Sequence, residues 1–136
     1  MISKKTKYGL QALTYIARHQ SEFGVIPISQ IIEYEKMSKK FLESILLTLR
    51  KSGYLGSKRG KGGGYYLLKN ATDIVICDVI RILEGPIAML PCVSLNYYEE
   101  CKECPDEATC GLHKLLIKVR DNTLNIFKNH TLQDLI

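Results

Sequence analysis

Tryptophan is absent from this sequence of 136 residues, and phenylalanine occurs only three times. Aliphatic side chains must therefore fill most of its hydrophobic core. No apolar run approaches the roughly 20 residues that a membrane-spanning helix needs, so no membrane partner is expected. Residues 1–5 lead into an amphipathic pattern rather than the apolar centre of a signal peptide. We therefore expect a cytoplasmic protein of one domain, or of one domain with an appendage.

Acidic residues are nearly absent from the middle of the chain. Residues 36–69 hold nine Lys or Arg against one acid, Glu43, a balance of +8 within a net charge of +5. Residues 70–110 have two basic residues against eight acids, a balance of −6, and contain all five cysteines. A solvated surface would by itself explain the basic stretch, but its acidic, cysteine-bearing neighbour suggests two functions in one chain.

The spacing of apolar residues predicts a mainly α-helical protein. The clearest helix is residues 38–52, in which apolar side chains recur at i, i+3, i+4 and i+7. These side chains are Leu42, Ile45, Leu46 and Leu49. The other predicted helices are residues 3–20, 29–35, 72–83 and 112–127.

A β-hairpin is predicted between the third and fourth helices. Residues 54–59 and 65–68 have strand character and flank the glycine-rich stretch 60–64. A nucleotide-phosphate loop is the competing interpretation of these glycines, but such a loop opens a helix, whereas a strand follows here. Two short helices and a basic hairpin make a winged helix-turn-helix, to which a long C-terminal helix is appended.

The second helix of this motif would enter the major groove of DNA and contact bases with its N-terminal residues. Lysines there can neutralise phosphates or donate to guanine, and a glutamate can accept from cytosine. An arginine on the hairpin can enter a narrow minor groove. The predicted DNA-contacting residues are Ser38, Lys39, Lys40 and Glu43 on the helix and Lys58, Arg59 and Lys61 on the hairpin. For Glu43, a surface charge paired across one helical turn is the alternative.

Four cysteines and a histidine form the second cluster of candidate residues. Cys92, Cys101, Cys104 and Cys110 have the spacing C-x8-C-x2-C-x5-C, and His113 follows. Soft thiolates and an imidazole suit an iron–sulfur cluster or zinc, with free, partly buried thiols as the alternative. A redox C-x-x-C normally lies beside a βαβ unit, which this chain lacks, so we expect no enzyme.

The fifth cysteine, Cys77, stands apart from this cluster. It lies among aliphatic residues and is predicted to be a small core side chain.

Several segments together resemble one bacterial family, the iron–sulfur-linked (Rrf-type) regulators that include IscR, NsrR and CymR. The resemblance covers nearly the whole chain. Its most specific part is the hairpin motif from Arg59 to Tyr65. The other segments are Phe41–Glu43, Leu49–Leu55, Asp78–Ile80, Leu83–Gly85 and Thr131–Leu135.

The resemblance implies a dimeric regulator, usually a repressor, paired through the helix 112–127. A two-fold dimer with one recognition helix per subunit implies a palindromic operator in double-stranded DNA. Residues matching Glu43 and Arg59 contact bases in IscR-like members, whereas Lys40 stands where a small hydroxyl residue is common. The implied division is a DNA-binding domain at 1–85, a cysteine-rich sensor loop at 86–110 and a dimerisation helix with tail at 111–136.

The resemblance also implies a cluster, [2Fe–2S] in preference to [4Fe–4S]. Cys92, Cys104 and Cys110 match the three family cysteines, and His113 matches the fourth ligand of IscR-like members. The gap before Cys104 is longer than usual and Cys101 is additional, so a four-cysteine and a three-cysteine, one-histidine cluster both stay open. The alternatives are a cluster-free regulator of cysteine and sulfur metabolism and a DNA-binding protein with structural zinc.

Overall fold

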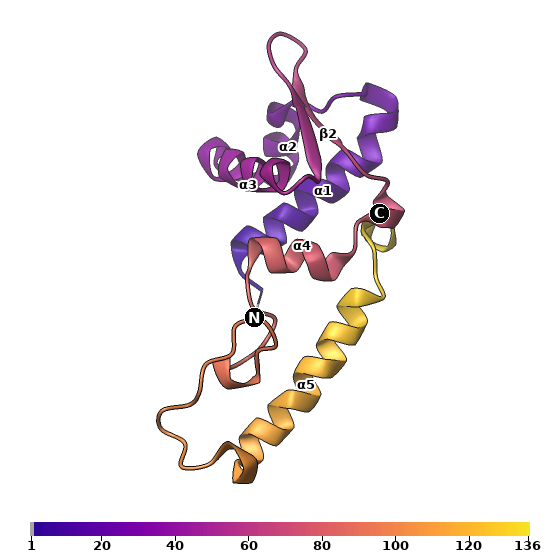
Figure 1. The fold of residues 1–136 in the computed structure, drawn as a ribbon. Helices are drawn as coiled ribbons and strands as arrows, with labels where there is room; N and C mark the ends of the chain where they lie inside the picture. Colours follow the sequence, from indigo (N-terminus) through magenta and orange to yellow (C-terminus); the bar gives the residue numbers. More distant parts are fainter. Residues whose placement is uncertain (1) are drawn as a thin grey trace.

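The computed structural model describes residues 2–136 as a winged helix-turn-helix from which a long helix extends (Figure 1). This confirms the mainly α-helical fold with a small β-hairpin. The helices are α1 (Lys4–Phe23), α2 (Ile28–Glu35), α3 (Lys39–Lys51), α4 (Ile76–Leu83) and α5 (Gly111–Lys128). The strands are β1 (Leu55–Lys58) and β2 (Gly64–Leu67), which pair antiparallel with Leu55 opposite Leu67.

The core is aliphatic, as the lack of tryptophan requires, and lies where α1, α2 and α3 meet. The amphipathic stripe predicted for α3 is confirmed, because all four of its apolar side chains are fully buried. Ser38 begins this helix, since its side-chain oxygen accepts a hydrogen bond from the backbone N–H of Phe41 at 3.2 Å. The fully buried core side chains include Leu13, Ile16, Ile31, Leu42, Ile45, Leu46, Leu49 and Leu132.

The predicted start of the fourth helix at residue 72 is wrong. Residues 71–73 form one 3₁₀ turn, Ile74 and Val75 are extended, and α4 begins at Ile76. The reason is a partner remote in sequence. The C-terminal segment pairs with this stretch, with Leu132 N–H donating to the Ile74 carbonyl at 2.8 Å and Ile76 N–H donating to the His130 carbonyl at 2.9 Å.

The long helix α5 begins at the end of the molecule far from the winged domain and runs back towards it, and residues 86–110 connect the end of α4 to its start (Figure 1). Leu116 and Leu124 on α5 are buried. Arg120 donates from Nη1 to the carbonyl of Val93 at 2.8 Å and so ties α5 to the connecting loop. Within residues 2–136, no helix has both the length and the apolar character that spanning a membrane would require.

Candidate functional site

The start of α3 presents the four residues predicted to contact DNA there. Ser38, Lys39, Lys40 and Glu43 are all exposed. Lys39 and Glu43 form an ion pair at 3.9 Å, one helical turn apart, as the alternative interpretation of Glu43 required. An exposed pair of this kind is worth less than about 1 kcal/mol, so either side chain is free to exchange its partner for a base or a phosphate.

Hydrogen bonds to three other segments of the chain connect the hairpin to the helical core. Ile26, in the loop before α2, exchanges two backbone hydrogen bonds with Tyr65, each of 2.8 Å. Leu67 N–H donates to the side-chain oxygen of Gln20 at 2.9 Å. Arg50, near the end of α3, donates to the hydroxyl of Ser57 at 3.1 Å. These contacts fix the position of the hairpin relative to α3.

The tip of the hairpin is built by glycines. Gly60 and Gly62 have φ of +89° and +76°, which only glycine adopts without strain. At Gly64 the reason is close approach, because a Cβ there would overlap the carbonyl oxygen of Ile26. The turn leads into β2 and not into a helix, so the phosphate-loop interpretation is excluded.

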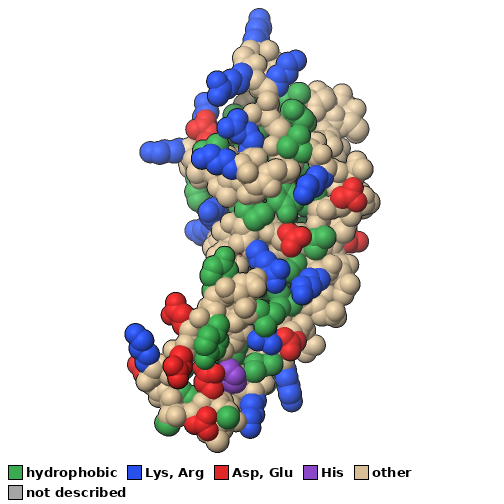
Figure 2. Space-filling model, viewed as in Figure 1, with side chains coloured by type: hydrophobic (Ala, Val, Ile, Leu, Met, Phe, Trp, Pro, Cys, Tyr) green, Lys and Arg blue, Asp and Glu red, His purple; other side chains and the backbone are tan. Residues whose placement is uncertain are grey.

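Lys58, Arg59 and Lys61 are exposed on this hairpin. Between it and the first turn of α2 lies an open hollow of about 320 Å³, lined in part by Arg50, Lys58 and Arg59. Figure 2 shows Lys and Arg side chains gathered at this end of the molecule, and Asp and Glu at the opposite end.

The sequence did not single out two further features of the basic surface. Arg50 faces the hairpin only because α3 and β1 are packed together. The first turn of α2 has no side chain capping it, and its residues Ile28 and Ser29 line the same hollow. Such a helix start favours a phosphate group.

The cysteine cluster lies in the loop before α5. Cys92 belongs to a single 3₁₀ turn, and Cys110 is the N-cap of α5, its sulfur accepting from the backbone N–H of His113 at 3.4 Å. None of the five cysteines forms a disulfide within residues 2–136. Cys92, Cys101, Cys104 and Cys110 are half-buried, whereas Cys77 is fully buried in α4 as expected.

Two of the loop thiols, Cys92 and Cys104, have a raised pKa. Partial burial raises the pKa of the Cys92 thiol, and nearby Cys101, Glu107 and Cys110 raise it further. Partial burial also raises the pKa of the Cys104 thiol, and a hydrogen bond with Cys110 adds to the increase. These two thiols are therefore protonated at neutral pH. A metal would have to displace these protons on binding.

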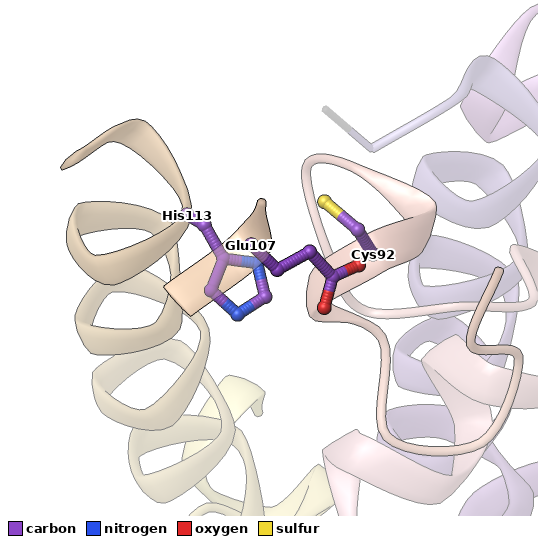
Figure 3. A group of neighbouring side chains, drawn as sticks. All are labelled: Cys92, Glu107 and His113. Carbon is purple, nitrogen blue, oxygen red and sulfur yellow. The ribbon is translucent and has the colours of Figure 1, made fainter. Parts of the chain in front are cut away.

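A glutamate that the sequence did not single out lies among these donors. Three possible ligand atoms lie within 4.8 Å of one another (Figure 3). They are the sulfur of Cys92, a carboxylate oxygen of Glu107 and a ring nitrogen of His113. Glu107 also accepts a hydrogen bond from the hydroxyl of Tyr98 at 2.8 Å, which raises the pKa of Tyr98 to about 12. The only sequence signal for Glu107 was an acid three residues before a cysteine, which is too common to be informative.

Comparison with known proteins decides the family. A family model, Rrf2, described as an iron-dependent transcriptional regulator, matches residues 2–136. This chain belongs to the Rrf2 family. An Rrf2-like HTH-type transcriptional regulator of Rhodobacter capsulatus is 40% identical over 138 residues, covering 100% of this chain and 92% of the relative. IscR of Pectobacterium atrosepticum, an HTH-type transcriptional regulator, is 30% identical over 99% of this chain and 78% of its own length.

A solved structure supports the same assignment. CymR, described as the global cysteine regulator of B. subtilis, superimposes with a TM-score of 0.80 at 31% identity, covering 99% of this chain and 95% of CymR. The Rrf2 protein described here is therefore a transcriptional regulator and not an enzyme. The resemblance found in the sequence is confirmed at the level of the family.

The long helix α5 of this Rrf2 protein has two apolar faces where the sequence suggested one. Leu116 and Leu124 face α4 and the loop and are buried. On another side, Leu112, Leu115 and Ile126 are each 56% exposed and Val119 is 37% exposed. Their spacing of three, four and seven residues aligns them along the helix.

Proposed function

We propose that this Rrf2-family protein is a cytoplasmic repressor that binds a palindromic operator as a homodimer, with an iron–sulfur cluster in the cysteine loop setting its affinity. The observation that carries the DNA-binding part is the exposed basic surface formed jointly by the start of α3, the hairpin and Arg50. These groups come from separate elements and are held on one side of the molecule by core packing and hydrogen bonds.

In this proposal α3 enters the major groove with Ser38, Lys39, Lys40 and Glu43 toward the bases and their flanking phosphates. Lysine donates to guanine O6 and N7, and glutamate accepts from the cytosine amino group. The Lys39–Glu43 pair opens at little energetic cost because both side chains are solvated, at 68% and 50% exposure.

The hairpin acts on the DNA backbone and the minor groove. Arg59, at the tip of the hairpin, is suited to a narrow minor groove, where the negative potential is strongest. Lys58, Lys61 and Arg50 neutralise phosphates, and the uncapped start of α2 receives another phosphate. Phosphate contacts fix the register of the protein, and the contacts of Arg59 and α3 supply specificity.

The homodimer is formed through α5. Its exposed stripe of Leu112, Leu115, Val119 and Ile126 is larger than scattered surface apolar residues would explain. A groove of about 160 Å³ between α4 and α5, lined by Val119 and Phe127 among others, continues this surface. A second copy covers both in a two-fold arrangement. The proposed division is therefore DNA binding in 1–85, sensing in 86–110 and dimerisation in 111–136.

The cysteine loop suits an iron–sulfur cluster by its donor chemistry. The four thiols of the loop and the imidazole of His113 are soft to borderline donors, the set that iron–sulfur clusters prefer. Cys92, Cys104, Cys110 and His113 are the proposed ligands of a [2Fe–2S] cluster, with Cys101 as the exchangeable fifth donor. A cluster adds a compact charged group that ties the loop to the start of α5.

The loop has a mechanical link to the dimer helix. Arg120 holds the Val93 carbonyl, one residue from Cys92, and its side chain is only 13% exposed. A change in the position of Cys92 is therefore transmitted to α5, and from α5 to the spacing of the two recognition helices. Two fixed half-sites bind well only at one such spacing.

A second candidate function is cluster-free regulation of cysteine metabolism. The structural similarity to CymR, described as a cysteine regulator, favours it. In that case the thiols of the loop themselves would be the sensing groups. Structural zinc is the third occupant that the same donors accommodate.

One experiment separates these functions. The protein is purified without oxygen, its visible spectrum is recorded, and iron, sulfide and zinc are measured per protomer. Iron and sulfide in equal amounts with visible absorbance support the cluster, zinc with no colour supports a structural ion, and no metal supports thiol sensing. Cys104→Ser is expected to lose the colour and Cys77→Ala, the matched control, to retain it.

The functional arm titrates cluster-loaded and metal-free protein against one palindromic duplex and its isolated half-site at one salt concentration. A dimer that favours the palindrome, with an affinity that changes on cluster loss, is expected. Identical affinities for loaded and metal-free protein would contradict cluster sensing. Monomers that bind half-site and palindrome equally would contradict the homodimer.

A further inference from the structure

Three side chains from three separate segments meet in the cysteine loop, and one of them is outside the proposed cluster. Cys92 comes from the turn at 91–93, Glu107 from the turn at 107–109, and His113 from the first turn of α5. The donor atoms are a sulfur, a carboxylate oxygen and an imidazole nitrogen, all within 4.8 Å of one another. Figure 3 shows the Glu107 side chain extending between the other two.

The imidazole of His113 lacks a partner. Its Nδ1 is buried and makes no hydrogen bond within residues 2–136. A buried ring nitrogen without a partner is unfavourable, because it has lost its water and gained nothing in exchange. Coordination of a cation by the lone pair of a neutral imidazole would satisfy it.

The carboxylate of Glu107 is held in position. Tyr98, nine residues earlier, donates its hydroxyl proton to Oε1 of Glu107 at 2.8 Å. Groups that hydrogen-bond to a metal ligand orient it, and their loss typically lowers metal affinity by 10- to 100-fold. The second oxygen of Glu107 remains available to a cation.

The distances fit one ion. Metal–ligand bonds to Cys, His and carboxylate are about 2.0–2.3 Å, so two ligands of a tetrahedral ion lie about 3.3–3.8 Å apart. A separation within 4.8 Å therefore requires only a modest contraction of the side chains. Sulfur, nitrogen and oxygen together suit borderline divalent ions such as Fe²⁺ and Zn²⁺, and three protein ligands leave a further position open.

We infer that Cys92, Glu107 and His113 form a site for a single divalent transition-metal ion, which is occupied when the cluster is absent. The site shares Cys92 and His113 with the proposed cluster, so the two occupants exclude each other. It does not depend on the cluster, because Glu107 is outside the proposed cluster ligands and neither Cys104 nor Cys110 belongs to the group of three donors. A free divalent metal ion is then a second signal for the same loop.

The test uses Co²⁺ as a spectroscopic probe for the reduced, metal-free, full-length protein. Visible absorption from thiolate-bound, four- or five-coordinate Co²⁺ should saturate at one ion per protomer. Glu107→Gln and His113→Ala should each weaken Co²⁺ binding at least tenfold, and Tyr98→Phe should weaken it in the same direction. Glu103→Gln, an exposed acid of the same loop, is the matched control and should bind as the original protein does.

Failure to bind Co²⁺, a loss smaller than tenfold in Glu107→Gln, or an equal loss in Glu103→Gln would each overturn the inference. Circular dichroism of each variant establishes that it is folded, and Tyr98→Phe provides a second variant that leaves the donor atoms intact. Cluster loading of Glu107→Gln is measured separately. If Glu107→Gln loads the cluster normally but no longer binds Co²⁺, the ion site is supported independently of the proposed function. If Cys104→Ser loses the cluster absorbance but still binds Co²⁺, the result concerns the cluster alone.

Discussion

The hairpin and the cysteine loop are both irregular or short segments at opposite ends of the molecule, yet they are held in place in different ways. The hairpin is tied by backbone and side-chain hydrogen bonds to the loop before α2, to α1 and to α3. The cysteine loop, residues 86–110, contains two single 3₁₀ turns, and most of its residues from 95 onward are exposed. One half-buried arginine, Arg120, ties its first part to α5.

Because of this difference, the proposed DNA-binding and sensing functions can be separated in one chain. The basic surface is preorganised by the core and needs no ligand to exist. The loop buries little apolar area to offset the conformational entropy of about 1–2 kcal/mol per ordered residue. Bonds from a bound metal or cluster would therefore have a large effect on the loop and a small one on the hairpin.

The largest effect is expected from Gly64→Ala, which breaks the attachment of the hairpin. The new Cβ overlaps the backbone of Ile26, which cannot move without losing its two hydrogen bonds to Tyr65. We expect about 3 kcal/mol of lost stability, at the upper end of the usual cost of overpacking, and a large loss of DNA affinity. Thermal unfolding and DNA titration measure both.

Gly62→Ala is the matched control for that substitution. A Cβ at Gly62 meets open space, so only the positive φ of +76° is unfavourable, at about 1–2 kcal/mol. Equal effects of the two substitutions would show that the hairpin is not held by the close approach at Gly64.

Arg120→Met tests the loop side of the comparison. The substitution keeps an apolar stem but removes the charged donor to Val93, which is expected to cost about 1.5–3 kcal/mol. Amide hydrogen exchange should accelerate in residues 92–98 and stay unchanged in β1 and β2. Faster exchange in both regions would mean that loop and hairpin are not independent.

A smaller effect, confined to binding, separates Arg59 from Lys61 on the hairpin. Arg59→Ala should weaken binding to the specific site by about 1–3 kcal/mol, whereas Lys61→Ala should weaken all sequences alike and reduce the dependence on salt concentration. Titrations of specific and random duplexes at several salt concentrations measure this. Unchanged binding of Arg59→Ala to both duplexes would show that the hairpin tip does not contact DNA.

The smallest effect is expected from Glu84→Gln. Glu84 lies between the hairpin and the cysteine loop, at the end of α4. Hydrogen bonds from Thr6 and Ser3, 2.6 and 2.7 Å long, lower the pKa of the Glu84 carboxyl. A carboxyl whose pKa is lower in the folded state stabilises the protein above its unfolded pKa of about 4.3, and this contribution is lost as the pH falls through the folded pKa.

Because Glu84 is partly exposed, less than about 1 kcal/mol is expected at pH 7. Denaturant unfolding at pH 7 and pH 3 measures the difference between the original protein and Glu84→Gln. The difference should shrink at the lower pH. A constant difference would show that the carboxylate charge does not contribute.

Most of the fold could be predicted from the sequence because its signals are local. The stripe of Leu42, Ile45, Leu46 and Leu49 has helical periodicity, and the glycines at 60–64 allow only a turn between two strands. The start of α4 could not be predicted, since Ile74 and Val75 are held extended by the C-terminal residues His130 to Leu132. Pairing between residues more than 50 positions apart leaves no periodic trace.

The same distinction applies to the candidate sites. Runs of charge placed Lys58, Arg59 and Lys61 on the hairpin, and the spacing of the cysteines marked the loop. Arg50 joins the basic surface only through the packing of α3 on β1, and Glu107 joins the donors only through the course of the loop.

The composition of the two ends of this protein can be seen in the sequence alone. One end is a basic hairpin with a glycine-rich turn, which follows an amphipathic helix, and the other is an acidic loop rich in thiols. Composition and periodicity are properties of neighbouring residues, so they are visible without the fold. Only the tertiary structure decided which side chains of different segments meet, such as Ile26 with Gly64, Arg120 with Val93, and Cys92 with Glu107 and His113. These contacts depend on how the helices pack and on the course of the loops, and packing is a property of the whole chain.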